Sequence, residues 1–379
     1  MGRFAGERGK PGAREAGSLL SIQVLRAIAA LVVILPHINR EFEVKFALPD
    51  ALPLEAFKVG NIGVDLFFVI SGFIMVYVSE GWFGREGAPA NFLARRFARI
   101  VPLYWASSAL LLAFVLVTYR NLGAANMSVG SVIASFAFFP HARPDGGVLP
   151  INAIGWTLNY EMFFYAVFSV ALLASRRTAV IAITLLFAAL AALGRALTEL
   201  PDALRFWTDP IILEFVLGMW IAIAFRRGWR LPRWATWVLL AAALAMIAAG
   251  LVVGLDRMPR VIERGVPAAL MVAALALASA PPSGALAWRG LGFLGDASYA
   301  LYLTHPVSLT LPRRLFPGFI DPAASPWLYA MMLIAIAVAV AIAVHLLYEK
   351  PATRWLQARI AGMPRLSRPR LPADGLQPS

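Results

Sequence analysis

Residues 19–38, LLSIQVLRAIAALVVILPHI, are the stretch that decides the fold. These twenty residues are almost entirely apolar, and twenty is the number that a helix needs to cross a lipid bilayer. Two groups in the stretch, Arg26 and His37, are unfavourable in hydrocarbon. An arginine near the middle of a span costs roughly 2.5–3.5 kcal/mol on insertion scales, so such residues usually face a polar interior. The stretch therefore predicts a membrane-spanning helix that forms one wall of a polar cavity.

The spacing of the two polar groups supports a shared cavity. Arg26 and His37 are eleven positions apart, which places them on nearly the same helix face and about 16 Å apart along the axis. The alternative is that Arg26 extends its long side chain to the membrane surface while His37 lies at an interface. Further buried polar groups elsewhere in the chain favour the cavity.

The composition is that of a membrane protein. Hydrophobic residues make up 60% of the chain and charged residues only 15%, whereas soluble domains contain about one quarter charged residues. The net charge of +13 is explained by arginine-rich cytoplasmic loops, so we expect the lipid bilayer, and no nucleic acid, as a partner. The chain has no cysteine, which excludes disulfides, a thiolate nucleophile and a cysteine metal site, and we predict no metal.

The apolar runs predict an all-α fold, a polytopic transmembrane helix bundle with about ten spans. With both termini cytoplasmic, 21 of the 34 lysines and arginines lie on the cytoplasmic side and 12 on the other. We expect a disordered basic segment at 1–17, a membrane domain at 18–352 and a basic, proline-rich tail at 353–379. The run at 129–140 is too short to span. The expected spans lie near 19–38, 60–79, 100–118, 154–174, 179–197, 207–225, 234–254, 265–280, 290–312 and 327–348.

Other ionisable residues fall inside these spans. Glu214 lies near the centre of its span, and Asp65, Glu161 and His305 lie in the outer halves of theirs. Intramembrane ionisable groups normally face a cavity and pair with one another. We therefore expect His37, Asp65, Glu161 and His305 to share one layer, with Arg26 slightly deeper. Glycines at positions 60, 63 and 72 are expected to permit close approach of neighbouring helices.

A second arginine motif marks the cytoplasmic start of the third span. In FLARRFARIVPLYW (92–105), Arg96 and Arg99 are three positions apart and therefore neighbours on one helix face. A helix start also presents unpaired N–H groups and a positive dipole end, and guanidinium forks match phosphate oxygens. The motif indicates a site for a phosphate-bearing ligand. The alternative is ordinary anchoring of a span by basic residues at the cytoplasmic surface.

Together these segments resemble the acyltransferase 3 family of integral-membrane acyltransferases. Arg26 and His37 match that family's arginine–ten residues–histidine motif, and Arg96 and Arg99 match its R-x-x-R motif. The resemblance covers nearly the whole chain, about 18–352. The opening SIQVLRAIAAL and the form NYEMFFY look most like the branch that decorates bacterial exopolysaccharides. The other similar segments are GVDLFFVISGF, RIVPLYW, WTLNYEMFFY and LGDASYALYLTHP.

The resemblance implies an O-acyltransferase of the bacterial inner membrane. It would move an acyl group, acetyl by default, from cytoplasmic acyl-coenzyme A to a hydroxyl of a cell-surface or exported polysaccharide, or of its lipid-linked precursor. Polysaccharide synthesis machinery is a further expected partner. Arg96 and Arg99 would hold the coenzyme phosphates, and the thioester would arrive near His37.

His37 suits the role of general base because its pKa ordinarily lies near working pH. Arg26 is expected either to stabilise the oxyanion or to hold the coenzyme, and these two roles stay open. Asp65 or Glu161 is expected to orient the imidazole or to neutralise Arg26. Direct transfer and an acyl-histidine intermediate are both compatible with the motif.

Two other classes of protein would also need a polar cavity. A transporter of polysaccharide or lipid-linked sugar would show no acyl turnover, and it predicts internal repeats and broken helices near the midplane. An assembly component of an export complex would have no need of the Arg26/His37 and Arg96/Arg99 motifs together. The sequence contains no convincing internal repeat, which favours the enzyme.

Overall fold

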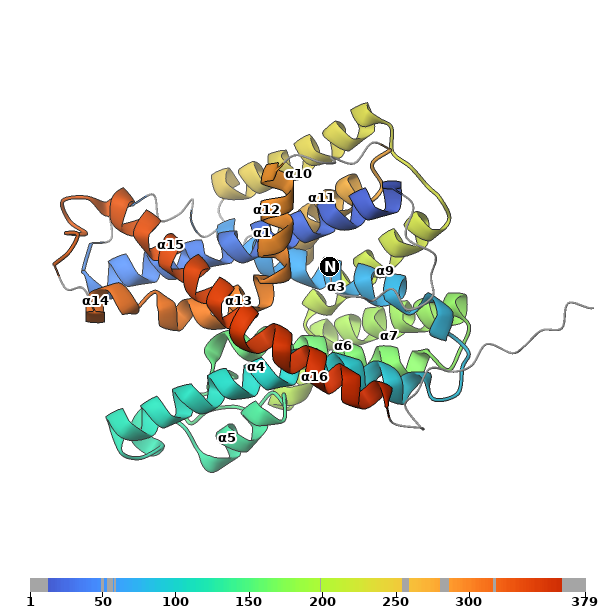
Figure 1. Cartoon of the computed structure of the whole chain (residues 1–379). Coiled ribbons are helices and arrows are strands. Elements are labelled where there is room, and N and C mark those ends of the chain that lie inside the picture. The colour runs from blue at the N-terminus through green and yellow to red at the C-terminus, as the bar shows by residue number, and fades with distance from the viewer. Residues whose placement is uncertain are drawn as a thin grey trace, which may run out of the picture.

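The structure, a computed structural model, confirms the all-α class. Throughout the part of the chain that it describes, the backbone forms helices and connecting loops, with one isolated bridge between Leu231 and Ala278 (Figure 1). The described residues are 13–48, 51–52, 57, 59–197, 199–253, 259–279, 286–315 and 318–362.

The α-helices range in length from five residues in α14 to 32 residues in α4. In chain order they are α1 (Ala13–Arg40), α3 (Ile62–Val78), α4 (Ala88–Tyr119), α5 (Val129–Phe136), α6 (Trp156–Ala171), α7 (Arg176–Ala196), α8 (Asp202–Trp207), α9 (Leu213–Arg226), α10 (Arg233–Val253), α11 (Val266–Ala276), α12 (Leu286–Asp296), α13 (Ser298–Ser308), α14 (Leu311–Leu315), α15 (Pro326–Val344) and α16 (Lys350–Ala361). Short 3₁₀ or π-helical turns join several of them: η1 (Glu41–Lys45), η2 (Val59–Asn61), η3 (Glu80–Trp82), η4 (Gly123–Ala125), η5 (Ala153–Gly155), η6 (Pro210–Ile212), η7 (Val261–Gly265) and η8 (His345–Glu349).

Six helical runs are long and apolar enough to cross a membrane. The other four predicted spans contain shorter helices: α6, α9, α11 and the pair α12 and α13. Six helices of spanning length, rather than ten, are therefore observed in the described residues. The six runs are Glu15–Lys45, Val59–Val78, Ala88–Tyr119, Arg176–Ala196, Arg233–Val253 and Pro326–Ala361.

The ends of the chain are more helical than expected. The first helix begins at Ala13, so residues 13–17 are not the disordered segment that composition predicted. Likewise α16 continues to Ala361, so the first part of the predicted tail is helical. The remaining parts of both predicted terminal segments, residues 1–12 and 363–379, lie outside the described residues.

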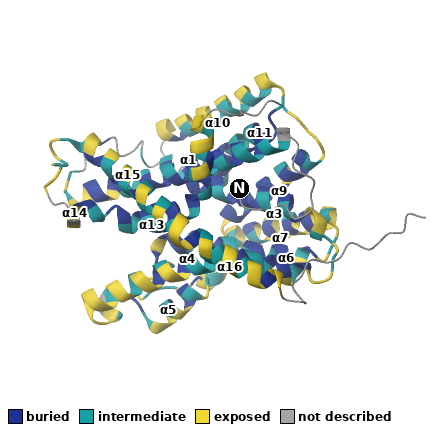
Figure 2. Ribbon diagram, viewed as in Figure 1, coloured by how far each residue is buried: buried dark blue, intermediate teal, exposed yellow. Residues whose placement is uncertain are grey.

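The central helices are α1 and α3, and the others surround them (Figures 1 and 2). In the apolar window of α3, 72% of residues are buried inside the protein, against 11% for α10. Because α10 is as apolar as α3 but exposed, its surface is suited to contact lipid rather than protein. The protein is thus a membrane-embedded bundle with α1 and α3 at its core.

The glycines predicted to permit close packing do so. A Cβ atom added to Gly72 of α3 would lie 2.0 Å from the carbonyl oxygen of Phe215 in α9, and one added to Gly218 would lie 1.9 Å from that of Val69. A Cβ atom on Gly63 would lie 2.4 Å from the carbonyl oxygen of Ala29 in α1. Small residues are what allow helix backbones to touch in a membrane, and here they hold α3 against both α1 and α9.

Ion pairs join the ends of four helices at one end of the bundle. Arg226 lies 2.6 Å from Glu80 and 3.7 Å from Glu15, and Glu80 also pairs with Arg176 at 2.7 Å. The Tyr77 hydroxyl donates to Glu15 at 2.5 Å. The start of α1, the end of α3, the start of α7 and the end of α9 therefore lie together.

Candidate active site

Arg26 lies inside the bundle and is bound by uncharged groups. Its guanidinium donates to the Gln23 side-chain oxygen at 3.2 Å and to the Ser298 hydroxyl at 3.0 Å. Gln23 in turn donates to Asp296 at 2.8 Å. Neither hydrogen bond of Arg26 is to a carboxylate, so its guanidinium is not in a direct ion pair among the described residues.

The partners of Arg26 come from a broken helix. The predicted span at 290–312 is two helices, α12 and α13, which meet at Ala297. The break places Asp296 and Ser298 at adjoining helix ends, where their side chains reach Gln23 and Arg26. The expectation of one continuous helix was wrong. Counting apolar residues does not show that Asp296 and Ser298 form hydrogen bonds with α1.

The R-x-x-R motif also points into the protein. Arg96 is only 7% exposed, and its guanidinium lies over the Phe92 ring at 5.7 Å. Arg99 is partly buried one turn further along α4. Basic residues that merely anchor a span would be expected at the exposed surface, so the burial of Arg96 favours a binding role over the anchoring alternative.

Glu161 of α6 lies between the two arginine motifs. It accepts hydrogen bonds from the Ser71 hydroxyl at 3.2 Å and from Tyr165. Tyr165 also interacts with Arg96, so this tyrosine links the carboxylate to the R-x-x-R motif. Glu161 thus helps to hold the arginines.

The two motifs converge on one buried polar centre. The charges that act on Arg26 include those of Arg99, Glu161, Asp296 and Glu349. We call Arg26, Arg96 and Arg99 the arginine cluster. Its members come from helices α1 and α4, which are far apart in sequence, and the described structure shows none of the three in a direct ion pair. The centre combines these arginines with carboxylates that do not bond to Arg26 directly, and guanidinium groups in such a partly dry site can bind phosphate or stabilise an oxyanion.

His37 lies beside His305, not beside a carboxylate. The two rings pack edge to face with centroids 4.7 Å apart. His305 is fully buried with Nδ1 3.2 Å from the Leu301 carbonyl oxygen, and its Nε2 has no hydrogen-bond partner among the described groups. Arg40 supplies the charge that acts on His37. His37 is therefore a partly exposed imidazole that packs against a second histidine rather than a carboxylate.

The helix pair α1 and α13 forms the site's frame. Arg26 contacts Ser298 near the start of α13, and His37 contacts His305 near its end, so the two helices run in the same direction side by side. The Tyr302 hydroxyl between these points bonds to Thr157 at 2.9 Å, which ties α13 to α6. The residues of α1 that were predicted to face a cavity thus contact α13.

Asp65 belongs to a different group. Its carboxylate receives two hydrogen bonds from Arg260, at 3.0 and 3.2 Å, and is fully buried. Glu214 lies fully buried against the same pair. We call Asp65, Glu214 and Arg260 the carboxylate cluster. Of the four residues expected to share one layer, the structure brings His37 and His305 into contact, whereas Asp65 pairs with Arg260 and Glu161 accepts hydrogen bonds from Ser71 and Tyr165. That all four lie at one depth stays a prediction.

Sequence reasoning missed several site residues. Gln23 is a neutral residue one helical turn before Arg26, and Arg260 was placed in a loop rather than in the interior. The segment LGDASYALYLTHP contains Asp296, Ser298 and His305, so it held a usable signal. What it lacked was any indication that the helix breaks within it.

Helices of spanning length around buried arginines and a pair of histidines are an arrangement compatible with a membrane-embedded acyltransferase. Comparison with family models agrees: residues 19–346 match the family described as "Acyltransferase domain" (Acyl_transf_3). The chain belongs to the acyltransferase 3 family, and it is an acyltransferase.

Two relatives are similar over most of their length. The "Exopolysaccharide production protein ExoZ" of Rhizobium meliloti (strain 1021) is 34% identical over 308 residues, which cover 80% of this chain and 92% of that protein. The "Acyltransferase MdmB" of Streptomyces mycarofaciens is 30% identical over 376 residues, or 90% of this chain and 93% of that protein. No solved structure matches the chain.

Proposed function

We propose that this protein transfers an acyl group, acetyl by default, from acyl-coenzyme A to a hydroxyl of an exported polysaccharide or its lipid-linked precursor. The observation that carries the proposal is the convergence of Arg26, Arg96 and Arg99 on one buried centre without direct ion pairs. The similarity to a protein named for exopolysaccharide production supports a polysaccharide acceptor.

Donor binding follows from the arginine cluster. Coenzyme A carries several phosphate charges, and planar guanidinium groups bind phosphate oxygens in pairs. In this proposal Arg96 and Arg99 hold the phosphates, while Tyr165 and Glu161 hold Arg96 in place. The thioester arm then extends along α1, because Arg26 and His37 lie about 16 Å apart on nearly one helix face.

The chemistry is a direct acyl transfer at His37. The imidazole removes the proton of the acceptor hydroxyl as its oxygen attacks the thioester carbonyl carbon. The tetrahedral intermediate collapses, the carbon–sulfur bond breaks, and the imidazolium returns the proton to the leaving thiolate. Arg26 either stabilises the oxyanion or holds the coenzyme arm, and His305 keeps the His37 ring in place. An acyl-histidine intermediate is the alternative that chemical trapping tests.

A histidine substitution tests the chemistry. In a deletion strain complemented with His37→Ala, the exported polysaccharide should lose its acyl esters, as measured by NMR of the purified polymer. The matched control is His141→Ala, because His141 is exposed in a loop away from the site. Esters at the wild-type level in a well-expressed His37→Ala strain would refute the base assignment.

We further propose that the protein resides in the bacterial inner membrane with both termini in the cytoplasm. The charge bias supports this orientation, and so does the ion-pair network, which gathers four helix ends from predicted cytoplasmic segments. The short helices α6, α9, α11 and α13 would then complete the predicted ten crossings together with loop residues or neighbouring turns.

The absence of cysteine from the sequence makes this orientation simple to test. Single cysteines replace Glu86 in one loop and Asp145 in the opposite loop, and intact cells with a permeable outer envelope are treated with a membrane-impermeant maleimide. Labelling of Asp145→Cys alone supports cytoplasmic termini. Labelling of Glu86→Cys alone would show that the termini lie on the opposite side of the membrane from the one proposed.

Sidedness separates the enzyme from a transporter. In sealed proteoliposomes of known orientation, acetyl-coenzyme A should be consumed only when it is supplied on the side of Glu86. A transporter would move glycan without consuming the thioester. If donor and acceptor were both used only from that side, the acceptor would be a cytoplasmic precursor.

A further inference from the structure

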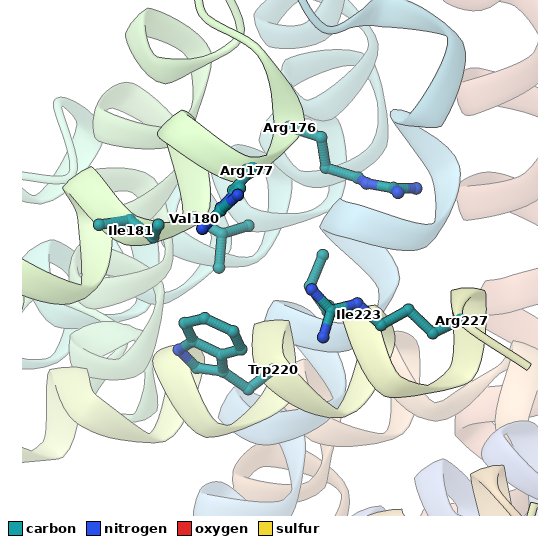
Figure 3. Close-up of a pocket in the computed structure, with 7 residues that line it drawn as sticks. All are labelled: Arg176, Arg177, Val180, Ile181, Trp220, Ile223 and Arg227. Carbon is teal, nitrogen blue, oxygen red and sulfur yellow. The ribbon is translucent and has the colours of Figure 1, made fainter. Parts of the chain in front are cut away.

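A recess lies between α7 and α9, apart from the arginine cluster. Its volume is about 180 Å³, and Figure 3 shows side chains of the two helices facing each other across it. The side chains that line it are three arginines and four apolar residues: Arg176, Arg177, Arg227, Val180, Ile181, Trp220 and Ile223.

The apolar part of the recess continues onto the outer surface of the bundle. Val180 and Ile223 form a buried floor, whereas Ile181 and Trp220 are 37% and 42% exposed. Leu185, one turn further along α7, is also exposed. In a membrane-embedded bundle such an exposed apolar strip faces lipid tails, so the recess opens towards the hydrocarbon.

The charged part is at the ends of the same helices. Arg176 is paired with Glu80, which also pairs with Arg226. Arg177 and Arg227 are exposed, and within the described chain no carboxylate pairs with either of them. The recess therefore has more positive charge than its neighbouring acid can balance. In the first turn of α7, the Thr178 N–H already donates to the Ser175 hydroxyl, and the N–H groups before it have no carbonyl partner within the helix.

We propose that this recess binds an anionic diacyl phospholipid. The phosphate would lie among Arg176, Arg177 and Arg227, and an acyl chain would descend along Trp220 and Ile181. This arrangement joins the two parts of the recess, because the positive rim lies at the helix ends and the apolar wall leads into the bilayer. A soluble phosphate compound would leave the apolar wall without a partner.

The site has a structural consequence. Arg176 connects through Glu80 to Arg226, and Arg226 connects to Glu15 at the start of α1. A phosphate bound at Arg176 would therefore tie α7 and α9 more firmly to the end of the helix that carries the catalytic residues. The bound lipid stabilises the bundle, and this inference does not depend on which acyl donor or acceptor is used.

Fluorescence quenching tests the site directly. The purified full-length protein in detergent micelles is titrated with brominated phosphatidylglycerol or brominated phosphatidylcholine, and the signal of Trp220 is obtained by subtracting the Trp220→Phe variant. Quenching by the anionic lipid should occur at roughly tenfold lower lipid fraction than quenching by the zwitterionic lipid. Inorganic phosphate should not reverse it.

Arginine variants decide whether the recess is responsible. Arg177→Ala/Arg227→Ala should abolish the preference for phosphatidylglycerol, whereas Arg233→Ala/Arg354→Ala, which removes the same charge from exposed positions outside the recess, should retain it. A preference that survives in the first variant, or equal quenching by both lipids in the wild type, would overturn the proposal.

Thermal unfolding gives an independent measurement if Trp220→Phe folds poorly. Phosphatidylglycerol should raise the unfolding temperature of the wild type more than phosphatidylcholine does, and this difference should be lost only in Arg177→Ala/Arg227→Ala. An equal rise with both lipids in the wild type would again overturn the proposal.

Discussion

The arginine cluster and the carboxylate cluster use the same residue types in opposite ways. In the carboxylate cluster, Arg260 makes two hydrogen bonds to Asp65 and has Glu214 beside it. In the arginine cluster, Arg26 bonds to neutral oxygen atoms, and Arg96 is held through a tyrosine. In the first cluster the arginine is held by a direct ion pair, whereas in the second, among the described residues, the nearby carboxylates act on Arg26 without bonding to it.

The difference teaches how to separate structural from functional charge in a membrane protein. A buried charge is costly, and the charge of an arginine in a bidentate ion pair is already compensated by its own partner. A buried cationic group whose nearby carboxylates do not bond to it directly is less fully compensated, and this is the case for Arg26. That cost is recovered when an anionic ligand binds, which is why we assign the donor site to the arginine cluster.

The largest effect should come from removing the R-x-x-R arginines. Each hydrogen bond to a charged group contributes about 1.5–3 kcal/mol, so Arg96→Ala/Arg99→Ala should weaken acyl-coenzyme A binding by roughly 10²- to 10⁴-fold. Isothermal titration calorimetry measures this loss. Arg96→Lys/Arg99→Lys should restore only part of it because the planar fork is lost. Unchanged binding in the alanine variant would mean that both residues only anchor the span at the cytoplasmic surface.

Breaking the carboxylate cluster should instead lower stability. Asp65→Ala leaves Arg260 without its bidentate partner, and we expect a loss of about 3 kcal/mol in the free energy of unfolding. The lower end of the usual range applies because the Arg260 side chain is 29% exposed. Unfolding in mixed micelles measures the loss, with Asp145→Ala in an exposed loop as the control. If the Asp65→Ala enzyme is fully stable but inactive, Asp65 takes part in catalysis, and the carboxylate cluster is not purely structural.

A smaller effect should follow from loosening Arg26. Ser298→Ala removes one of its two hydrogen bonds and should reduce kcat/KM about tenfold, which corresponds to ~1.4 kcal/mol. Steady-state kinetics with acetyl-coenzyme A checks this, and Ser298→Thr should retain most of the activity. A change in KM alone would indicate that Arg26 holds the coenzyme, and a change in kcat alone that it stabilises the oxyanion.

The smallest effect should come from Glu214→Gln. One negative charge is enough to balance Arg260, and Asp65 already supplies it. The isosteric amide should therefore change the free energy of unfolding by less than about 1 kcal/mol. If unfolding experiments show a loss as large as that of Asp65→Ala, Arg260 depends on both carboxylates and the description of the cluster must be revised.

Local sequence patterns anticipated the frame of the site well. The apolar length of 19–38 and the eleven-residue spacing placed Arg26 and His37 on one helix, and α1 contains both. The close-packing role of Gly63 and Gly72 was also anticipated. These features depend on neighbours within a few helical turns, so a linear pattern contains them.

Side-chain partners were much less predictable. Asp65 and Arg260 are 195 positions apart, and Arg26 and Ser298 are 272 apart. Hydropathy reports whether a segment is apolar, but not which polar groups meet when segments pack. For the same reason, the break at Ala297 was hidden inside an otherwise continuous apolar run.

The sequence by itself determined that the protein is a membrane helix bundle, that Arg26 and His37 share a face of α1, and that the chain resembles acyltransferases. Only the tertiary structure decided that His305, rather than a carboxylate, packs against His37, and that Asp65 is neutralised by Arg260. The physical reason is that span formation follows from local hydrophobicity. The electrostatic role of a buried charge depends on which distant residue packing places beside it.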